Sequence, residues 1–352
     1  MSKACVLGAG SWGTALSVVL AHNMDQVVLW GRPEDGIRDI RHQRENKRYL
    51  PGVKLGNNIF PSQELAAAVN GCKLLVLSVP AQAQRQVLEQ VRPYWRRSMY
   101  VVNTAKGLEM GTHMRLSQVC REVLGEASME RYAVLSGPSH AEEVGRALPT
   151  AVTVAAQLQD TACYVQDCFM TDALRVYTNA DTAGVELGGA LKNVIALAAG
   201  MAYGLGYGDN TVAALMTRGL AEITRLGEHM GGAAATFAGL SGMGDLIVTC
   251  GSRHSRNRRA GELLGSGLSL KDTQAQIGMV VEGVTTVQAV YELAQQSNVE
   301  MPITSACYRI IWQGAAPGEE LMRLMTRQRR HETEEEFRGS ALQSPDDNCR
   351  DT

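Results

Sequence analysis

The sequence has little net charge, no paired cysteines and no apolar leader, and each absence excludes a class of protein. Its 352 residues carry a formal charge of -2, so the overall charge does not favour nucleic acid as a partner. The eight cysteines are scattered without a CxxC pair or a His at zinc-ligand spacing, which indicates neither a metal site nor a disulfide framework. A strand-like segment follows Lys3 directly, so we expect no secretion signal and a cytoplasmic protein.

Long uninterrupted apolar runs are also missing. The most apolar segment, residues 189–206, contains Lys192 and Asn193 and is rich in glycine, which predicts a packed helix and no stable membrane insertion. Hydrophobic residues make up 45% of the chain and charged residues 20%, as in a globular protein, and the length predicts about two domains.

Short apolar runs alternate with helical patterns in the first half of the chain. Such alternation predicts an α/β fold with a doubly wound, mainly parallel sheet. We expect strands at residues 4–7, 27–30, 74–79, 100–103, 133–136 and 151–156, and helices near residues 13–23, 34–46, 81–92, 112–124 and 139–146.

The strand pattern stops at about residue 184, and helical periodicity follows. The sequence therefore predicts an α/β domain over residues 1–183 and an all-helical domain over residues 184–335. Residues 336–352 are rich in charge, Ser and Pro, so we expect a flexible tail.

The segment GAGSWGTA contains a GxGxxG pattern between an expected strand and an expected helix. Gly8 permits a tight turn, Gly10 lets the backbone approach a pyrophosphate, and Gly13 allows the helix to pack closely on the strand. The pattern predicts a dinucleotide-binding loop, and a glycine turn without a ligand is the alternative.

The end of the second expected strand bears on which dinucleotide is bound. Gly31 stands where an NAD-specific protein commonly has an acidic residue, and Arg32 follows it. Glu34 and Asp35 are close enough to blur the assignment. We predict that NADP is accepted and that NAD is accepted as well; Arg32 as a solvated loop cation is the alternative.

Two lysines are candidates for proton transfer to a carbonyl oxygen. Lys192 lies in an apolar helix, where burial would lower the pKa of its ammonium group toward neutrality. Lys106 follows the strand at residues 100–103, and ligands of open α/β sheets bind beyond the carboxyl ends of strands. A surface lysine is the alternative for each.

A basic turn at residues 251–265 suits a phosphate. Ser255 is a candidate N-cap, which would direct backbone N–H groups outward together with Arg256 and Asn257. Nucleic-acid binding and a solvated face are the alternatives, although the segment has no interleaved aromatic residues. Its arginines are Arg253, Arg256, Arg258 and Arg259.

Asp245 follows three glycines and precedes an apolar run. It could orient a substrate hydroxyl or pair with a lysine, and it could equally cap a helix.

Taken together, the motifs resemble those of bacterial-type NAD(P)-dependent glycerol-3-phosphate dehydrogenases. The resemblance covers roughly residues 4 to 330. It rests on GAGSWGTAL, NKRYLPG, SVP, TAKGLE, SGPSHAEEV, GVELGGALKNVIALAAG, GDNTVAALMTRGLAEITRLG, GLSGMGDLIVTC, SRNRRAG, VVEGVTT and MPIT.

The resemblance implies a Rossmann-like first domain and a role for each matching residue. It implies that Lys192 is the catalytic proton donor and acceptor, and that Lys106 contacts both cofactor and substrate. The implied cofactor contacts are Gly8, Gly10, Ser11, Trp12, Gly13, Arg32, Ala141, Arg256, Val280 and Glu282. The implied substrate contacts are Gly137, Ser139, Asp245, Ser255, Arg256 and Asn257. His140 departs from the pattern, because the family often has an aromatic residue there.

The implied activity is the NAD(P)H-dependent, reversible reduction of dihydroxyacetone phosphate to sn-glycerol 3-phosphate, a product that phospholipid synthesis uses. The resemblance also implies that the enzyme is a homodimer. Two alternatives remain. A dehydrogenase of another phosphorylated or carboxylated hydroxy compound would use the same plan, although the basic turn and the two lysines favour phosphate. A non-catalytic sensor of nicotinamide redox state would bind the cofactor without turnover.

Overall fold

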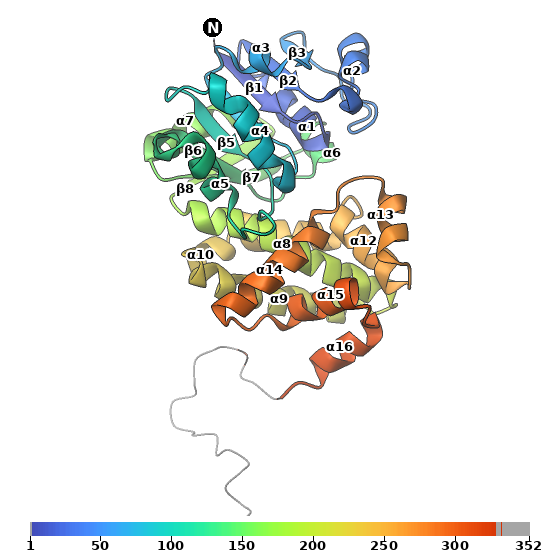
Figure 1. Cartoon of the computed structure of the whole chain (residues 1–352). Helices are drawn as coiled ribbons and strands as arrows, with labels where there is room; N and C mark the ends of the chain where they lie inside the picture. Colours follow the sequence, from blue (N-terminus) through green and yellow to red (C-terminus); the bar gives the residue numbers. More distant parts are fainter. Residues whose placement is uncertain (1, 329–331, 333–352) are drawn as a thin grey trace, which may run out of the picture.

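A computed structural model describes residues 2–328 and 332, and these form a sheet region followed by a helical region (Figure 1). The last strand ends at Asn179 and the first long helix begins at Thr182, next to the boundary expected from the sequence. The tail predicted for residues 336–352 lies outside the described residues.

The sheet region contains eight strands in the order β3-β2-β1-β4-β5-β6-β7-β8. All neighbouring strands are parallel except β6 and β7, which confirms the mainly parallel sheet. The strands are β1 Lys3–Leu7, β2 Gln26–Trp30, β3 Ile59–Ser62, β4 Leu74–Leu77, β5 Tyr100–Asn103, β6 Tyr132–Ser136, β7 Thr150–Ala156 and β8 Leu174–Asn179.

Helices cover both faces of this sheet, because its central strands are apolar on both sides. Val6 faces a core shared with α1, α6 and α7, whereas its neighbour Leu7 faces a core shared with α3, α4 and α5. The fold is therefore doubly wound, as expected. The helices of this region are α1 Ser11–Leu20, α2 Ile37–Gln43, α3 Leu65–Val69, α4 Gln84–Val91, α5 Leu116–Leu124, α6 Ala141–Val144 and α7 Gln159–Phe169.

The helical region is built around α8, Thr182–Gly204, which lies between the sheet and the remaining helices (Figure 1). This helix is long and apolar enough to cross a membrane, but its apolar window is 100% buried inside the protein, which confirms the packed helix expected from the sequence. Residues 234–251 pass the same test of length and composition with 44% burial. The other helices are α9 Asp209–His229, α10 Ala234–Phe237, α11 Asp245–Gly251, α12 Arg256–Gly265, α13 Leu270–Ile277, α14 Glu282–Ser297, α15 Pro302–Gln313 and α16 Pro317–Met325.

Helices α8 and α12 contact each other through their backbones. A Cβ atom on Gly200 of α8 would lie 2.0 Å from the carbonyl oxygen of Arg258, and one on Gly261 of α12 would lie 2.1 Å from that of Leu197. Each glycine is followed by another four residues later, so a stripe of small residues forms the contact on both helices. The close approach fixes α12 against the helix that carries Lys192.

A buried glutamate joins α8 to the sheet region. The carboxylate of Glu186 accepts hydrogen bonds from the Tyr132 hydroxyl at 2.8 Å, from the backbone N–H of Ser117 at 2.8 Å and from the Ser117 hydroxyl at 2.5 Å. The Arg115 guanidinium also contacts it, at 3.1 Å. Because these partners come from α5 and β6, the first turns of α8 are held against the sheet.

Candidate active site

One buried carboxylate bridges the two lysines that the sequence singled out. Asp245 Oδ2 accepts a hydrogen bond from Lys106 Nζ at 2.7 Å, and Asp245 Oδ1 accepts one from Lys192 Nζ. Lys192 Nζ also contacts Thr249 Oγ1 at 2.6 Å. Asp245 therefore pairs with lysines, and no side-chain hydrogen bond caps the start of α11.

The charges in this cluster shift the pKa of both buried members. Burial lowers the pKa of Lys192 to about 7, even though the Asp245 carboxylate raises it, and the Lys106 cation lowers it further. Burial alone would raise the pKa of Asp245, but the two ammonium groups outweigh it and hold that pKa below its ordinary value. Asp245 therefore stays ionised near neutral pH, whereas its neighbour Lys192 can gain and lose a proton there.

Glycines on α8 allow the other parts of the cluster to approach Lys192. A Cβ atom on Gly188 would lie 2.7 Å from the Ser241 carbonyl oxygen, and one on Gly189 would lie 2.6 Å from Ser136 Oγ. Ser241 belongs to a π-helical turn, Leu240–Gly244, that leads directly into Asp245. The turn and the end of β6 thus pack on α8 one turn before Lys192.

The loop after β6 holds Lys106 from the opposite side. The carbonyl oxygen of Gly137 accepts hydrogen bonds from Lys106 Nζ and from the Ser139 hydroxyl, each at 2.9 Å. Gly137 has a φ of +144°, and a Cβ atom there would lie 3.0 Å from the Cα atom of Val152. The position therefore requires glycine.

A chain of amide hydrogen bonds, which the sequence did not predict, runs behind the lysines. Asn193 Nδ2 donates to the Lys106 carbonyl at 3.0 Å, and Asn193 Oδ1 accepts from Asn257 Nδ2 at 2.8 Å. Asn257 Oδ1 in turn accepts from the backbone N–H of Gly283 at 2.9 Å. The expectation that Asn257 points outward is wrong for its side chain, because the amide is buried and bonded inside the protein.

The start of α12 has the geometry expected for an anion site. Ser255 is the N-cap, and its hydroxyl accepts a hydrogen bond from the backbone N–H of Arg258 at 3.2 Å. Arg256 is exposed and donates to the Val280 carbonyl at 3.0 Å. The Arg258 guanidinium lies over the Tyr203 ring, 4.4 Å from its centroid, so this arginine of the basic turn has a packing role.

Glu282 connects the helical region to the loop after β4. Its carboxylate accepts a hydrogen bond from the backbone N–H of Ala81 at 3.3 Å. A Cβ atom on Gly107 would lie 2.8 Å from the Ala81 Cβ atom, so the residue after Lys106 has no room for a side chain. Burial raises the pKa of the Glu282 carboxyl, although the Ala81 N–H and the Arg256 cation oppose this shift.

The glycine loop fits a dinucleotide. Gly8 has a φ of +117°, and a Cβ atom on it would lie 2.6 Å from the Ser78 carbonyl oxygen. A Cβ atom on Gly13 would lie 1.9 Å from the Gly8 carbonyl oxygen, whereas nothing lies within 4 Å of one on Gly10. Gly10 is also the N-cap of α1 and has no side chain to bind the first-turn N–H groups, which suits a pyrophosphate.

Two buried polar atoms in this loop region lack partners among the described residues. They are Trp12 Nε1 and Ser78 Oγ. Such atoms are expected to bond to a ligand or to water. Ser11 is the first residue of α1, and Ala141, the first residue of α6, is buried in the core that α6 shares with α1. Ser78 belongs to the SVP motif, yet its side chain was not among the predicted contacts.

The structure explains why no acidic residue follows β2. A Cβ atom on Gly31 would lie 2.7 Å from both the Ala9 Cβ and the Ile37 Cδ1 atoms, so a larger side chain has no room. The next side chain, Arg32, is 61% exposed and pairs with Glu34 at 3.2 Å and with Asp35 at 3.4 Å.

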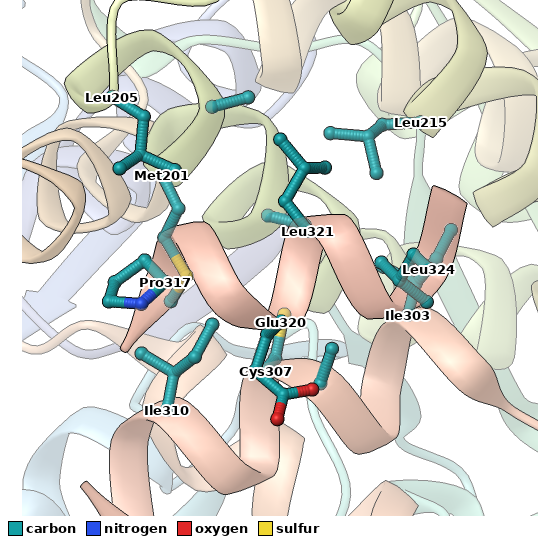
Figure 2. Close-up of a pocket in the computed structure, with 13 residues that line it drawn as sticks. Met201, Leu205, Leu215, Ile303, Cys307, Ile310, Pro317, Glu320, Leu321 and Leu324 are labelled. Carbon is teal, nitrogen blue, oxygen red and sulfur yellow. The ribbon is translucent and has the colours of Figure 1, made fainter. Parts of the chain in front are cut away.

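An apolar pocket lies away from these residues, between α8, α9, α15 and α16 (Figure 2). Its volume is about 30 Å³, and Glu320, which pairs with Arg309 at 2.6 Å, is the one charged residue among the described residues that line it. None of the residues predicted for the site lines this pocket. Within residues 2–328, the structure contains no group of three His, Cys, Asp or Glu arranged to hold a metal.

Comparisons with known proteins show which family the chain resembles. Residues 3–162 match the N-terminal model, and residues 181–322 the C-terminal model, of NAD-dependent glycerol-3-phosphate dehydrogenase. A glycerol-3-phosphate dehydrogenase (NAD(P)+) of Syntrophomonas wolfei is 57% identical over 335 residues, which cover 95% of this chain and 98% of the relative. One of Moorella thermoacetica is 58% identical over 329 residues, which cover 94% and 97%. The crystal structure of a glycerol-3-phosphate dehydrogenase of Coxiella burnetii is similar, with a TM-score of 0.88, 37% identity, and coverage of 93% of this chain and 99% of that one.

Proposed function

Because this chain belongs to the family of NAD(P)-dependent glycerol-3-phosphate dehydrogenases, we propose that its Lys106–Asp245–Lys192 cluster is the site that reduces dihydroxyacetone phosphate to sn-glycerol 3-phosphate. The chain is an oxidoreductase that acts on a CH–OH group with NAD or NADP. The observation that carries the proposed site is the single buried carboxylate that bridges both lysines.

Lys192 is the proton donor in the direction of reduction. As the ketone becomes an alkoxide, the ammonium group of Lys192 gives a proton to its oxygen, and the amine takes a proton back in the reverse direction. A pKa of about 7 suits both directions near neutral pH, because the proton is held neither too tightly nor too weakly. The Thr249 hydroxyl and the Asp245 carboxylate hold Nζ in place.

Lys106 and Asp245 set the charge of the site. With both lysines protonated, two cations share one carboxylate, so the cluster carries a net positive charge where the alkoxide forms. The Gly137 carbonyl fixes Lys106 Nζ, and the Ser139 hydroxyl lies at the same carbonyl, which places both groups for contact with the substrate.

Residues at the starts of two helices hold the charged parts of substrate and cofactor. The N-terminus of α12, with Ser255 and Arg256, binds the substrate phosphate; Asn257 contributes its backbone N–H, since its amide is already bonded. The glycine loop with Ser11, Trp12 and Arg32 binds the dinucleotide, and Ala141, Val280 and Glu282 border it. When bound, the nicotinamide supplies the hydride that the ketone carbon accepts.

The test is the loss of absorbance of NADPH, and separately of NADH, when the purified protein receives dihydroxyacetone phosphate. Oxidation that depends on this ketone is the expected result. Cofactor binding without oxidation would contradict the proposed function and favour a redox sensor. Oxidation with a different phosphorylated ketone alone would contradict only the substrate.

Matched variants test the assigned roles. Lys192→Ala should lower kcat by at least about a hundredfold with little change in NADPH binding, because the proton donor is lost, whereas Lys271→Ala, at an exposed lysine of α13, should not. Arg256→Ala should raise the KM for dihydroxyacetone phosphate, whereas Arg259→Ala, an exposed arginine one turn away, should leave it within about twofold. Near-normal kcat in the first variant would remove Lys192 from the mechanism.

The remaining parts of the proposal concern the cell and the assembly. We propose a cytoplasmic homodimer that supplies glycerol 3-phosphate for phospholipid synthesis, as the resemblance to the family implies. Light scattering should give twice the mass of the chain, and a monomeric mass in the active preparation would contradict the dimer.

A further inference from the structure

His140 is near both the lysine cluster and the start of α12. It is the N-cap residue of α6 through its backbone, and its side chain takes no part in that cap. Its ring centroid lies 5.8 Å from that of His254, which directly precedes Ser255. The ring is also close enough to Lys192 and Lys106 for both cations to disfavour its protonation, which lowers the pKa of the imidazole.

The ring nitrogen Nε2 of His140 is buried and has no hydrogen-bond partner among the residues that the structure describes. A buried polar atom without a partner typically costs as much as a lost hydrogen bond, so natural proteins pair such atoms with a ligand or with ordered water. The residue therefore needs an explanation that packing within the chain does not provide.

We propose that His140 is a substrate-binding residue, and that its Nε2 atom forms a hydrogen bond to the phosphate-bearing arm of the three-carbon substrate. This inference rests on the function proposed above, which places the substrate carbonyl at Lys192 and the phosphate at the N-terminus of α12. The imidazole is near both points, so we place the arm that joins them within reach of Nε2.

The surroundings of the ring suit this role. Burial lowers the pKa of the His140 imidazole, and the Lys192 cation lowers it further, whereas Glu142 and the Val248 carbonyl favour the protonated form. The Val248 carbonyl accepts a hydrogen bond from the ring, so a ring that also donates from Nε2 to a phosphate oxygen carries protons on both nitrogens. The negative charge of the bound phosphate favours this form against burial and the two lysine cations.

The experiment compares the steady-state kinetics of His140→Phe and His140→Gln with wild type. Loss of a hydrogen bond to a phosphorylated group should raise the KM for dihydroxyacetone phosphate roughly ten- to a hundredfold in His140→Phe. Inorganic phosphate, which competes with this substrate, should inhibit more weakly, so its inhibition constant should also rise. The Kd for NADPH should stay within about twofold of wild type. His140→Gln retains a donor and an acceptor, so it should recover part of the loss.

The control is His254→Gln, which removes the exposed neighbouring ring and should leave the KM within about twofold of wild type. An unchanged KM in His140→Phe would overturn the inference and assign Nε2 to ordered water. A fall in kcat with an unchanged KM would also overturn it. So would a higher KM without weaker inhibition by inorganic phosphate. Failure of the wild-type protein to oxidise NADPH with dihydroxyacetone phosphate would instead contradict the proposed function, so the two failures are distinguishable.

Discussion

Replacing Asp245 by Asn should move the pH dependence of the reduction. The substitution keeps the shape of the side chain and removes the charge that holds Lys192 in its protonated form. The carboxylate raises the pKa of Lys192 against the effect of burial, and the balance of the two effects puts this pKa at about 7. Without the charge, burial and the Lys106 cation both act in the same direction and lower this pKa.

The size of the shift follows from Coulomb's law. Two unit charges at hydrogen-bond distance, about 3 Å, attract each other by about 5 kcal/mol at an effective dielectric constant of about 20. That energy corresponds to about four pKa units. The neutral amide still accepts a hydrogen bond, so we expect a shift of at least about two units, to a pKa of about 5 or below. At pH 7 the protonated fraction would then fall about 50-fold.

The assay is kcat/KM for dihydroxyacetone phosphate with saturating NADPH between about pH 5.5 and 9, expressed as the ratio of variant to wild type. Titration of the substrate phosphate cancels in this ratio. The loss in Asp245→Asn should shrink as the pH falls, because the ammonium form returns. Thr249→Val keeps the carboxylate and removes one neutral hydrogen bond to Nζ, so its profile should shift by less than about one unit. A loss of equal size at pH 5.5 and pH 8 in a folded Asp245→Asn protein would refute the reasoning.

Three further predictions concern packing, a buried acid and the cofactor. Gly200→Ala should lower the free energy of unfolding by at least about 2 kcal/mol in urea titrations, since its Cβ would lie 2.0 Å from the Arg258 carbonyl oxygen; Gly251→Ala, with nothing within 4 Å, should change it by no more than about 1 kcal/mol. Burial raises the pKa of Glu222 from 4.5 to about 7, so the folded state binds the proton more tightly than the unfolded state, and stability falls as the pH rises through this window. Between pH 4.5 and about pH 7, the free energy of unfolding of the wild-type protein should therefore fall by up to about 3 kcal/mol relative to that of Glu222→Gln. Curves of unfolding free energy against pH that run parallel for the two proteins would contradict the raised pKa. Arg32→Ala should raise the KM for NADPH about three- to tenfold and that for NADH less, and equal effects would show that Arg32 does not read the 2′-phosphate.

Most of the sheet followed from the sequence, and its edges did not. The central strands are apolar on both faces and stand out as short hydrophobic runs. The edge strands were missed because neither is a continuous apolar run: β3 contains Pro61 in only four residues, and β8 alternates buried Leu174 and Val176 with exposed Arg175 and Tyr177. That alternation is itself a strand signal and was overlooked. The antiparallel pairing of β6 and β7 was also not predicted, because strand direction depends on tertiary contacts.

The candidate site was predictable where chemistry and motif coincide. Both lysines and the Ser255 cap were singled out from charge and spacing, whereas Asp245 was left open between pairing with a lysine or substrate and capping a helix. Thr249 was missed, although it lies four residues after Asp245 and therefore on the same helix face, which is a usable signal. Asn193 had no such signal, since its partners Lys106 and Asn257 are 87 and 64 residues away in the chain.

The position of Lys192 depends on contacts at both ends of α8. Glu186 holds the helix to the sheet region six residues before the lysine, and Gly200 holds it against α12 eight residues after it. Because an α-helix rises about 1.5 Å per residue, these two anchors lie about 20 Å apart with Lys192 between them. The backbone of Lys192 therefore cannot move relative to the proposed phosphate-binding turn of α12 without breaking a backbone contact or a buried carboxylate network. It follows that the distance between the proposed proton donor and the proposed phosphate site depends on the packed helices, and that a loosened α8–α12 contact should impair catalysis as well as stability.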